Sequence, residues 1–332
     1  MTEADYIKEI REQANSYEHS IQAIISFDSA VRYDDQKKEY VSGSYLSPGR
    51  KLNKGSVDSD DQVTPDIVIQ LSEDYGIIGE VKITASTNND FKNASEQMHN
   101  YDNELYGWRT EAFKVDSHDL SLLVHDLNRN VARRYFEKEQ FDKKFNLIAC
   151  ALITRANASY KIEKYFGVFS NERIEKKLED PVAIPLEKFV KTISEIKFYD
   201  VEPPIEYTMD ILWMNLFNEI SKEERKGKII EVNCKKATAM LNERFTFPRI
   251  DERQPKVPRE AWVRRALDSF VAIGYGEKDH KDNDTYHIRY FYMKKESMLE
   301  VFAKKYFQAK KKKIVQVEEE QLEIEGLNTS NG

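Results

Sequence analysis

The pattern of apolar and polar residues in the first part of the chain predicts a long helix and a β-hairpin. Apolar residues from position 7 to 31 recur at spacings of three, four and seven, which places them on one face of a helix. Apolar residues then alternate in segments 65–71 and 77–83, which predicts two strands. Residues 72–76 between them are mostly polar and end in glycine, so we expect the strands to pair as a hairpin.

Strands and helices continue to alternate beyond this hairpin. Residues 120–125 and 147–154 are strand-like, and residues 90–106 and 128–144 are helix-like. This alternation predicts an α/β domain. Residues 41–62 are rich in Ser, Gly, Asp and Lys, which predicts a long surface loop.

The pattern changes in the second half of the chain. The predicted elements are a helix (209–220), a short strand (229–232), two helices (235–244 and 258–273) and a hairpin (274–292). Gly274 is expected to end the second of these helices. This order is typical of a winged helix-turn-helix, so we predict a mainly helical winged-helix domain. The expected division of the chain is a first domain at 1–170, a connector at 171–204, the winged-helix-like domain at 205–313 and an acidic, disordered tail at 314–332.

The distribution of charge along the chain supports this division into domains. The 332 residues carry a net charge of −7, which by itself argues against a nucleic-acid partner. Residues 205–313, however, hold 24 Lys and Arg against 17 Asp and Glu, so this part is basic. The chain has two cysteines and no long apolar run, which predicts a cytoplasmic protein without a disulfide framework or a membrane span.

Two carboxylates and a lysine are expected to converge on the first hairpin. If its turn centres near residue 73, Asp66 faces Glu80 across the two strands. Lys82 lies two residues after Glu80, so both side chains point to the same face of their strand. Carboxylates in such a patch suit Mg²⁺, which polarises phosphoryl oxygens and activates water. The alternative is an amphipathic hairpin in which Glu80 and Lys82 form a solvated ion pair.

The sequence Pro65-Asp66, followed by Glu80-Val81-Lys82, resembles the PD-(D/E)xK nuclease superfamily. The resemblance covers about the first 165 residues and implies a restriction-endonuclease-like mixed sheet flanked by helices. It implies that Asp66 and Glu80 bind Mg²⁺ or Mn²⁺, together with the backbone carbonyl of Val81. It also implies that Lys82 serves the attacking water.

The same resemblance suggests three assisting residues. The family core often carries a further Glu on the preceding helix, and Glu18 is the candidate for this metal ligand, with Asp28 as a rival. One branch, related to recombination-linked exonucleases, adds Gln-x-x-x-Tyr on the following helix. Gln97 and Tyr101 match this spacing, which places both on one helix face.

Basic residues in both halves are candidates for contacts with DNA. In the first half they lie in the predicted loop, where a nuclease would approach the substrate backbone. In the second half they lie on the second helix and on the hairpin of the winged-helix-like domain. The candidates are Arg50, Lys51, Lys54, Arg259, Arg264, Arg265, Lys278 and Arg289. Winged helices also bind proteins, so a partner or dimer interface is the alternative for the second half.

The resulting functional hypothesis is a metal-dependent DNA endonuclease that hydrolyses phosphodiester bonds. Restriction or phage defence is the first biological role that we expect, and repair, recombination or transposition is the alternative. A hypothesis of another class is a non-catalytic DNA-binding or regulatory protein. The expected partners are DNA and, because cutting both strands takes two sites, a second copy or a partner subunit.

Overall fold

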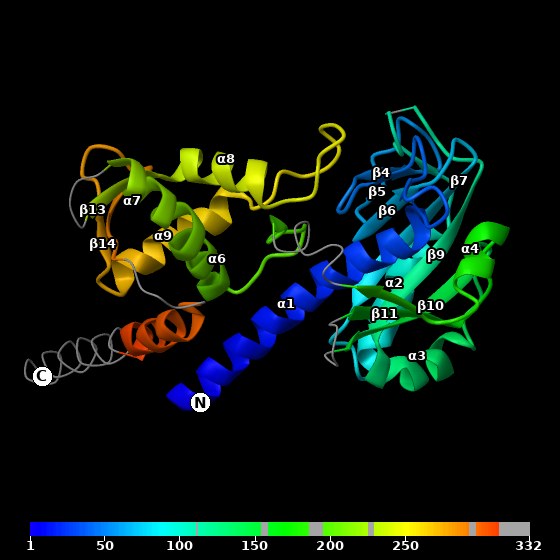
Figure 1. Ribbon diagram of the computed structural model, residues 1–332, viewed down its shortest axis with the longest axis horizontal. Helices are drawn as coiled ribbons and strands as arrows, with labels where there is room; N and C mark the ends of the chain where they lie inside the picture. The colour runs from blue at the N-terminus through cyan, green and yellow to red at the C-terminus, as the bar shows by residue number, and fades with distance from the viewer. Residues whose placement is uncertain (111, 154–158, 186–194, 225–228, 292–296, 312–332) are drawn as a thin grey trace, which may run out of the picture. The chain divides into compact units, whose positions relative to one another are not determined.

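The chain divides into two compact units (Figure 1). The computed structural model describes residues 1–110, 112–153, 159–185, 195–224, 229–291 and 297–311. Unit 1 comprises residues 1–15, 202–243 and 258–332, and unit 2 comprises residues 16–201 and 244–257. Helix α1 (Glu3–Arg32), which confirms the predicted first helix, begins in unit 1 and ends in unit 2. The predicted disordered tail lies outside the described residues.

Unit 2 is built on a mixed sheet in which seven strands of the described residues pair (Figure 1). In spatial order these are β12 (Val182–Pro185), β11 (Ser159–Phe166), β10 (Phe145–Ile153), β9 (Ser117–His125), β7 (Tyr75–Lys82), β6 (Ile67–Gln70) and β3 (Tyr45–Leu46). Strands β10, β9 and β7 are parallel to one another, and the outer neighbours pair in antiparallel fashion. The α/β prediction is therefore confirmed, and Thr154, the predicted end of one strand, lies outside the described residues.

Helices α2 (Asn88–Tyr101) and α3 (Arg129–Phe136) cover one face of this sheet. Their apolar side chains form one buried cluster with residues of the central strands, such as Ile78 and Leu122. Side chains two residues apart on a strand point the same way, so Glu80 and Lys82 share the face of Ile78. The candidate catalytic side chains thus lie on the face that α2 covers.

Helix α2 is shorter than the sequence pattern predicts. It begins with a capping box, in which Thr87 and Asp90 satisfy each other's backbone N–H groups. It ends at Tyr101, and the predicted continuation to residue 106 is wrong because residues 105–106 pair in strand β8 (Leu105–Tyr106).

Helix α3, which follows the short helix η1 (Asp126–Asn128), also ends early. The prediction extended this helix to residue 144, whereas the structure ends it at Phe136. Beyond it, the backbone N–H groups of Asp142 and Lys143 donate to the carboxylate of Asp102, at 2.6 and 2.7 Å. These bonds fix a non-helical turn before β10.

The predicted surface loop at 41–62 is largely ordered and partly buried. Besides β3 it contains β4 (Leu52–Lys54) and the start of β5 (Gln62–Val63), which form a three-stranded sheet with β8. Residues 47–50 are buried, and the backbone N–H groups of Ser47 and Gly49 donate to the carbonyls of Val68 and Pro65. Composition alone does not predict this order and burial, because polar segments also occur at the edges of sheets.

Unit 1 has the predicted order of helix, strand, two helices and hairpin. Its elements are α6 (Ile205–Ile211), the π-helical turn η2 (Leu212–Phe217), α7 (Asn218–Glu224), β13 (Ile229–Asn233), α8 (Cys234–Arg244), α9 (Glu260–Ala272), β14 (Gly276–Lys278) and β15 (Thr285–Arg289). The strands form an antiparallel sheet in the order β13-β15-β14. Gly274, at a φ of 78°, follows the end of α9 as predicted, and residues 299–311 are helical.

The boundaries of the units differ from the predicted domains. Residues 1–15 belong to unit 1, where Tyr6 and Ile10 form an apolar cluster with Ala303. The expected connector at 171–204 contains α4 (Glu172–Lys177) and the edge strand β12, and most of it belongs to unit 2. Residues 244–257, between α8 and α9, also belong to unit 2.

Strands β1 (Tyr33–Asp34) and β2 (Glu39–Tyr40) form a separate ribbon after α1. Among the residues that the structure describes, no helix combines the length and the apolar character needed to cross a membrane.

Candidate active site

The β6–β7 hairpin brings Asp66 and Glu80 opposite each other. Ile67 pairs with Gly79 and Val68 pairs with Ile78, so continuing the register by one residue sets position 66 against position 80. The register predicted from the turn position is therefore confirmed. Glu80 is buried, with 2% of its surface exposed, whereas Asp66 is partly buried.

Hydrogen bonds fix the three polar side chains of the Asp66–Glu80–Lys82 patch. The backbone N–H of Val81 donates to Asp66 Oδ2 at 2.9 Å, which holds the carboxylate against the neighbouring strand. Lys82 Nζ donates to Glu80 Oε2 at 2.8 Å. The hydroxyl of Tyr101, from α2, donates to Glu80 Oε1. The structure thus brings together four of the predicted site residues.

The electrostatics of this patch are dominated by burial and by charge repulsion. Burial raises the pKa of the Asp66 carboxyl well above its usual range, and the Glu80 carboxylate raises it further. Burial acts to lower the pKa of Lys82, but the carboxylates of Glu80 and Asp66 outweigh this effect and raise it. Lys82 is therefore held as an ammonium, and the patch keeps two facing carboxyl groups that repel each other in their charged forms.

We expect the Asp66→Asn variant to be more stable than the wild type. The amide keeps an acceptor for the Val81 N–H and removes the repulsion with Glu80, so the free energy of unfolding should rise by about 1–2 kcal/mol in metal-free buffer. Urea unfolding measures this change, and Asp60→Asn, at an exposed aspartate, is the matched control. A clear loss of stability would indicate that Asp66 serves the fold as an ion-pair partner instead.

Tyr101 is positioned by a buried histidine. His118, on β9, is 4% exposed, and its Nε2 donates to the backbone carbonyl of Tyr101 at 2.9 Å. This bond ties the last turn of α2 to the sheet, so the Tyr101 hydroxyl reaches Glu80. Burial lowers the pKa of His118 to about 4, because the charged imidazolium is poorly solvated there.

The shift at His118 predicts a loss of stability in mild acid. The unfolded histidine titrates near pH 6.5 and the folded one near 4, so the unfolded state binds more protons between these values. Stability should be fully present above about pH 6.5 and fall on acidification by up to about 3 kcal/mol at pH 4. Urea unfolding between pH 7.5 and 5 tests this, and a His118→Gln variant should show a shallower pH dependence. An equal pH dependence in both proteins would contradict the assignment.

Tyr199 lies near the patch and was not predicted from the sequence. It is 5% exposed, its backbone N–H donates to the hydroxyl of Tyr17 at 3.1 Å, and the two rings lie 4.9 Å apart. Burial raises the pKa of the Tyr199 phenol, and the carboxylates of Asp66 and Glu80 raise it further, so its hydroxyl stays protonated close to both. Tyr199 lies in the expected connector, where no sequence motif marked it.

Two other predicted site residues, Glu18 and Gln97, are not hydrogen-bonded to the patch within the described part of the chain. Glu18 is partly buried on α1, and Gln97 is partly buried on α2. Asp28 is buried and forms an ion pair with Arg32, one turn further along α1. This pairing explains an acidic residue in the apolar stripe of α1.

The structure contradicts the predicted DNA contact of Arg50. Its side chain is fully buried and forms two hydrogen bonds with the carboxylate of Asp251, at 2.8 and 2.6 Å. Its Nε donates to the carbonyl of Gly107 at 2.5 Å. Arg50 therefore holds segment 244–257 within unit 2 and is inaccessible to DNA.

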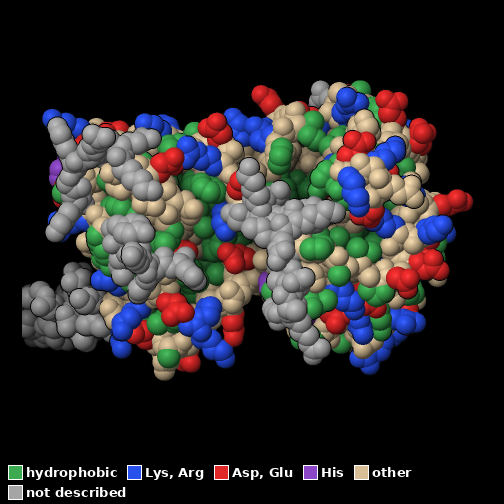
Figure 2. Space-filling view, in the orientation of Figure 1, with side chains coloured by type: hydrophobic (Ala, Val, Ile, Leu, Met, Phe, Trp, Pro, Cys, Tyr) green, Lys and Arg blue, Asp and Glu red, His purple; other side chains and the backbone are tan. Residues whose placement is uncertain are grey.

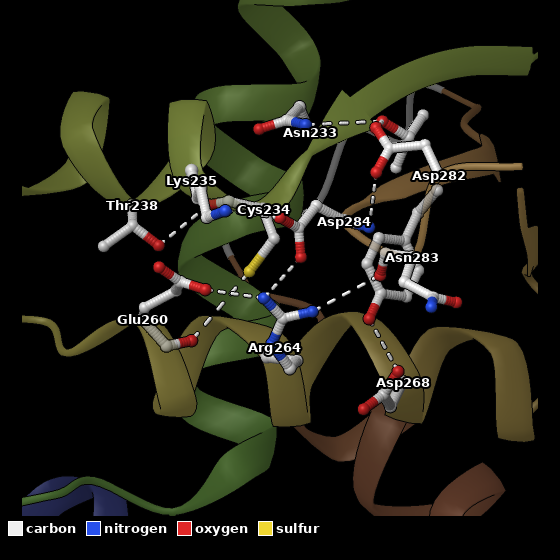
Figure 3. Close-up of polar contacts among 12 residues, drawn as sticks. Asn233, Cys234, Lys235, Thr238, Glu260, Arg264, Asp268, Asp282, Asn283 and Asp284 are labelled. Atoms are coloured by element: carbon white, nitrogen blue, oxygen red, sulfur yellow. Dashed lines mark hydrogen bonds and ion pairs between the residues drawn. The ribbon is translucent and has the colours of Figure 1, made fainter.

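Arg264, a candidate on α9 of unit 1, is also engaged internally (Figure 3). Its Nη2 atom donates to Glu260, at 2.5 Å, and to Asp284, at 2.7 Å, and Nη1 donates to the carbonyl of Asn283 at 3.3 Å. These bonds join α9 to the hairpin loop, and Lys235 forms an ion pair with the same Asp284. The arrangement gives Arg264 a structural role.

The remaining cationic candidates differ in their accessibility. Lys51, Arg259, Arg265 and Arg289 are exposed, and Lys54 and Lys278 are partly buried. Arg259 lies over the ring of Trp262 and Lys278 over that of Tyr286. Lys54 forms an ion pair with Asp61, and Arg265 with Glu202. The Arg265–Glu202 pair is exposed and therefore weak, so Arg265 remains available to a polyanion.

Within the described part of the chain, no three His, Cys, Asp or Glu side chains are grouped to hold a metal ion. No protein-family model, curated protein or solved structure matches the chain. The geometry of the Asp66–Glu80–Lys82 patch therefore carries the functional assignment.

Proposed function

We propose that the chain is a metal-dependent deoxyribonuclease of the PD-(D/E)xK type, with its active site at the Asp66–Glu80–Lys82 patch. The observation that carries the proposal is the facing pair of carboxyl groups with an ammonium group on the same surface. Two facing carboxyl groups with limited access to water are costly to the fold, and such costs are concentrated at functional sites. A solvated ion pair, the alternative for this hairpin, does not fit a Glu80 that is 2% exposed.

The oxygen donors of the patch fit Mg²⁺ or Mn²⁺. Asp66 and Glu80 would hold the ion together with the carbonyl of Val81, and waters and a substrate phosphate would complete its shell. Two carboxylates suffice for Mg²⁺, which commonly keeps several waters in protein sites. When bound, such an ion supplies charge stabilisation for a phosphoryl group and activates water.

The remaining groups of the patch would orient the Glu80 carboxylate and water, and would offset negative charge. Lys82, held as an ammonium by its two carboxylate neighbours, would orient water and offset negative charge on the phosphodiester. Tyr101 fixes one oxygen of Glu80 while Lys82 bonds the other, so the Glu80 carboxylate has a defined orientation. Tyr199 supplies a protonated hydroxyl close to the pair.

We propose a winged-helix-like DNA-binding module for unit 1. Support comes from the order of its elements and from the sheet order β13-β15-β14. Arg259 at the N-cap of α9, Arg265 on α9 and Arg289 on β15 are exposed cations for a phosphate backbone. Restriction or phage defence is the role we favour for such a protein, and repair, recombination or transposition would use the same chemistry.

The experiment that tests the proposed function is a cleavage assay with the full chain. Plasmid, linear duplex and single-stranded DNA are incubated with Mg²⁺ or Mn²⁺, and parallel reactions contain excess EDTA. We expect cleavage that requires the metal. Metal-independent cleavage, or no cleavage of any substrate with either metal, would contradict the proposal.

A further inference from the structure

A polar groove lies between the start of α2 and helix α3 in unit 2. It has a volume of about 680 Å³, and it is lined by Ser86, Asn88, Val131, Arg134, Tyr135, Lys138 and Glu139. This volume lies in the range of small-molecule binding sites. The lining combines two cations, an aromatic ring and short polar side chains.

The two cations of the groove are available to a ligand. Arg134 and Lys138 are exposed, and neither forms an ion pair within the described residues. The acidic residue of the groove, Glu139, is already engaged, because its Oε2 accepts from the hydroxyl of Ser95, at 2.8 Å, and bonds His99 Nε2, at 3.1 Å. The two cations therefore outnumber the one carboxylate of the lining, which these bonds hold toward Ser95 and His99. Figure 2 shows Lys and Arg side chains mixed with acidic ones on the visible face of unit 2.

The aromatic ring of the groove packs beside two buried aromatic rings. Tyr135 is partly buried, and its ring lies 6.4 Å from that of Phe91 and 5.3 Å from that of Phe136. One part of the ring packs on the core while the rest lines the groove. Aromatic side chains beside cations are the usual means of binding single-stranded nucleic acid, since bases stack on the ring and phosphates meet the cations.

The Ser86 edge of the groove is close along the chain to the proposed active site. Ser86 follows Lys82 by four residues, so their Cα atoms are at most about 14 Å apart. The backbone N–H of Ala85 donates to the carbonyl of Lys82 at 3.1 Å, and this turn shortens the separation. Lys82 points to the sheet face that α2 and α3 cover. About four stacked nucleotides of one strand span this distance.

We infer that this groove binds a single strand of DNA next to the Asp66–Glu80–Lys82 patch. Arg134 and Lys138 contact its phosphates, and one of its bases stacks on Tyr135. The inference rests on the proposed nuclease function for the identity of the ligand, and it adds the path that one strand takes beyond the cleaved bond.

Binding of the full chain to fluorescent oligonucleotides in EDTA tests the groove without cleavage. We expect Arg134→Glu with Lys138→Glu to weaken binding of a single-stranded oligonucleotide about tenfold or more. The slope of log affinity against log salt should become shallower by about 1.4, because two phosphate contacts are lost. Tyr135→Leu should weaken binding about tenfold without a change in slope, and Tyr135→Phe should bind like the wild type.

The matched control is Lys37→Glu with Lys176→Glu, which makes the same change of charge at two exposed lysines elsewhere in unit 2. Thermal unfolding of each variant confirms that it is folded. Equal affinities and slopes for the groove and control variants would overturn the inference, and so would equal losses for single-stranded and duplex DNA. Wild-type cleavage with Mg²⁺ is measured separately. If the groove variants lose affinity but the wild type does not cleave DNA, the nuclease proposal is refuted and the strand-binding groove stands. If the wild type cleaves DNA but the groove variants bind as the controls do, the nuclease proposal stands and the groove inference is refuted.

Discussion

The Lys82→Ala variant is expected to lose metal-dependent cleavage of DNA by about 10²- to 10³-fold. Removing a preorganised charge that stabilises the reacting phosphate costs about this much in other enzymes. Lys82 is the cation bonded to Glu80 in the patch, and both carboxylates of the patch hold its charge. The measurement is the rate of plasmid cleavage at saturating Mg²⁺.

Two comparisons make this prediction specific. Lys37→Ala, at an exposed lysine, should cleave at the wild-type rate, which excludes a general effect of lost charge. Lys82→Arg keeps a cation but changes its geometry, so we expect partial activity. A Lys82→Ala variant that folds and cleaves as fast as the wild type would remove Lys82 from the mechanism.

The Arg50→Ala variant is expected to lose about 3 kcal/mol of folding stability. The substitution leaves the Asp251 carboxylate, 31% exposed, without its bidentate partner, and it leaves the Gly107 carbonyl without a donor. Breaking a buried ion pair from one side typically costs about 3–5 kcal/mol, and the exposure of Asp251 places this case at the lower end. Urea unfolding gives the value.

A double-mutant cycle separates the Arg50–Asp251 bond from other effects. If the pair holds segment 244–257 to unit 2, Asp251→Ala should cost little more in the Arg50→Ala background. The neighbouring Lys51→Ala, at an exposed lysine, should change stability by less than about 0.5 kcal/mol. A small effect of Arg50→Ala, equal to that of Lys51→Ala, would contradict the buried pair.

The elements that could be predicted are those with a regular spacing of apolar residues. The helix at α1, the hairpin β6–β7 and the central strands follow from apolar spacing, because each buries one face or both. The register that sets Asp66 against Glu80 follows from the position of the turn alone. Tyr101 was found through a motif at helical spacing, and its bond to Glu80 confirms that it faces the patch.

The parts that could not be predicted depend on contacts between distant segments. Arg50 lies in a polar segment that predicts an exposed loop cation. Its burial depends on its partner Asp251, some two hundred residues away in the sequence. Tyr199 reaches the patch through Tyr17 on α1, and neither lies in a recognisable motif. Helix α2 ends at Tyr101 because β8 pairs with β4, a partner that local sequence does not reveal.

A crystal structure of the full chain with Mn²⁺ and an oligonucleotide would show whether Asp66 and Glu80 share a divalent cation. We expect an anomalous peak for one ion at about 2.1 Å from oxygens of Asp66, Glu80 and the Val81 carbonyl, with the Lys82 ammonium beside the phosphate. The anomalous signal should be lost in Glu80→Gln crystals. If no metal ion is bound at the β6–β7 hairpin of the wild type, at Mn²⁺ concentrations that support cleavage, the shared cation is contradicted.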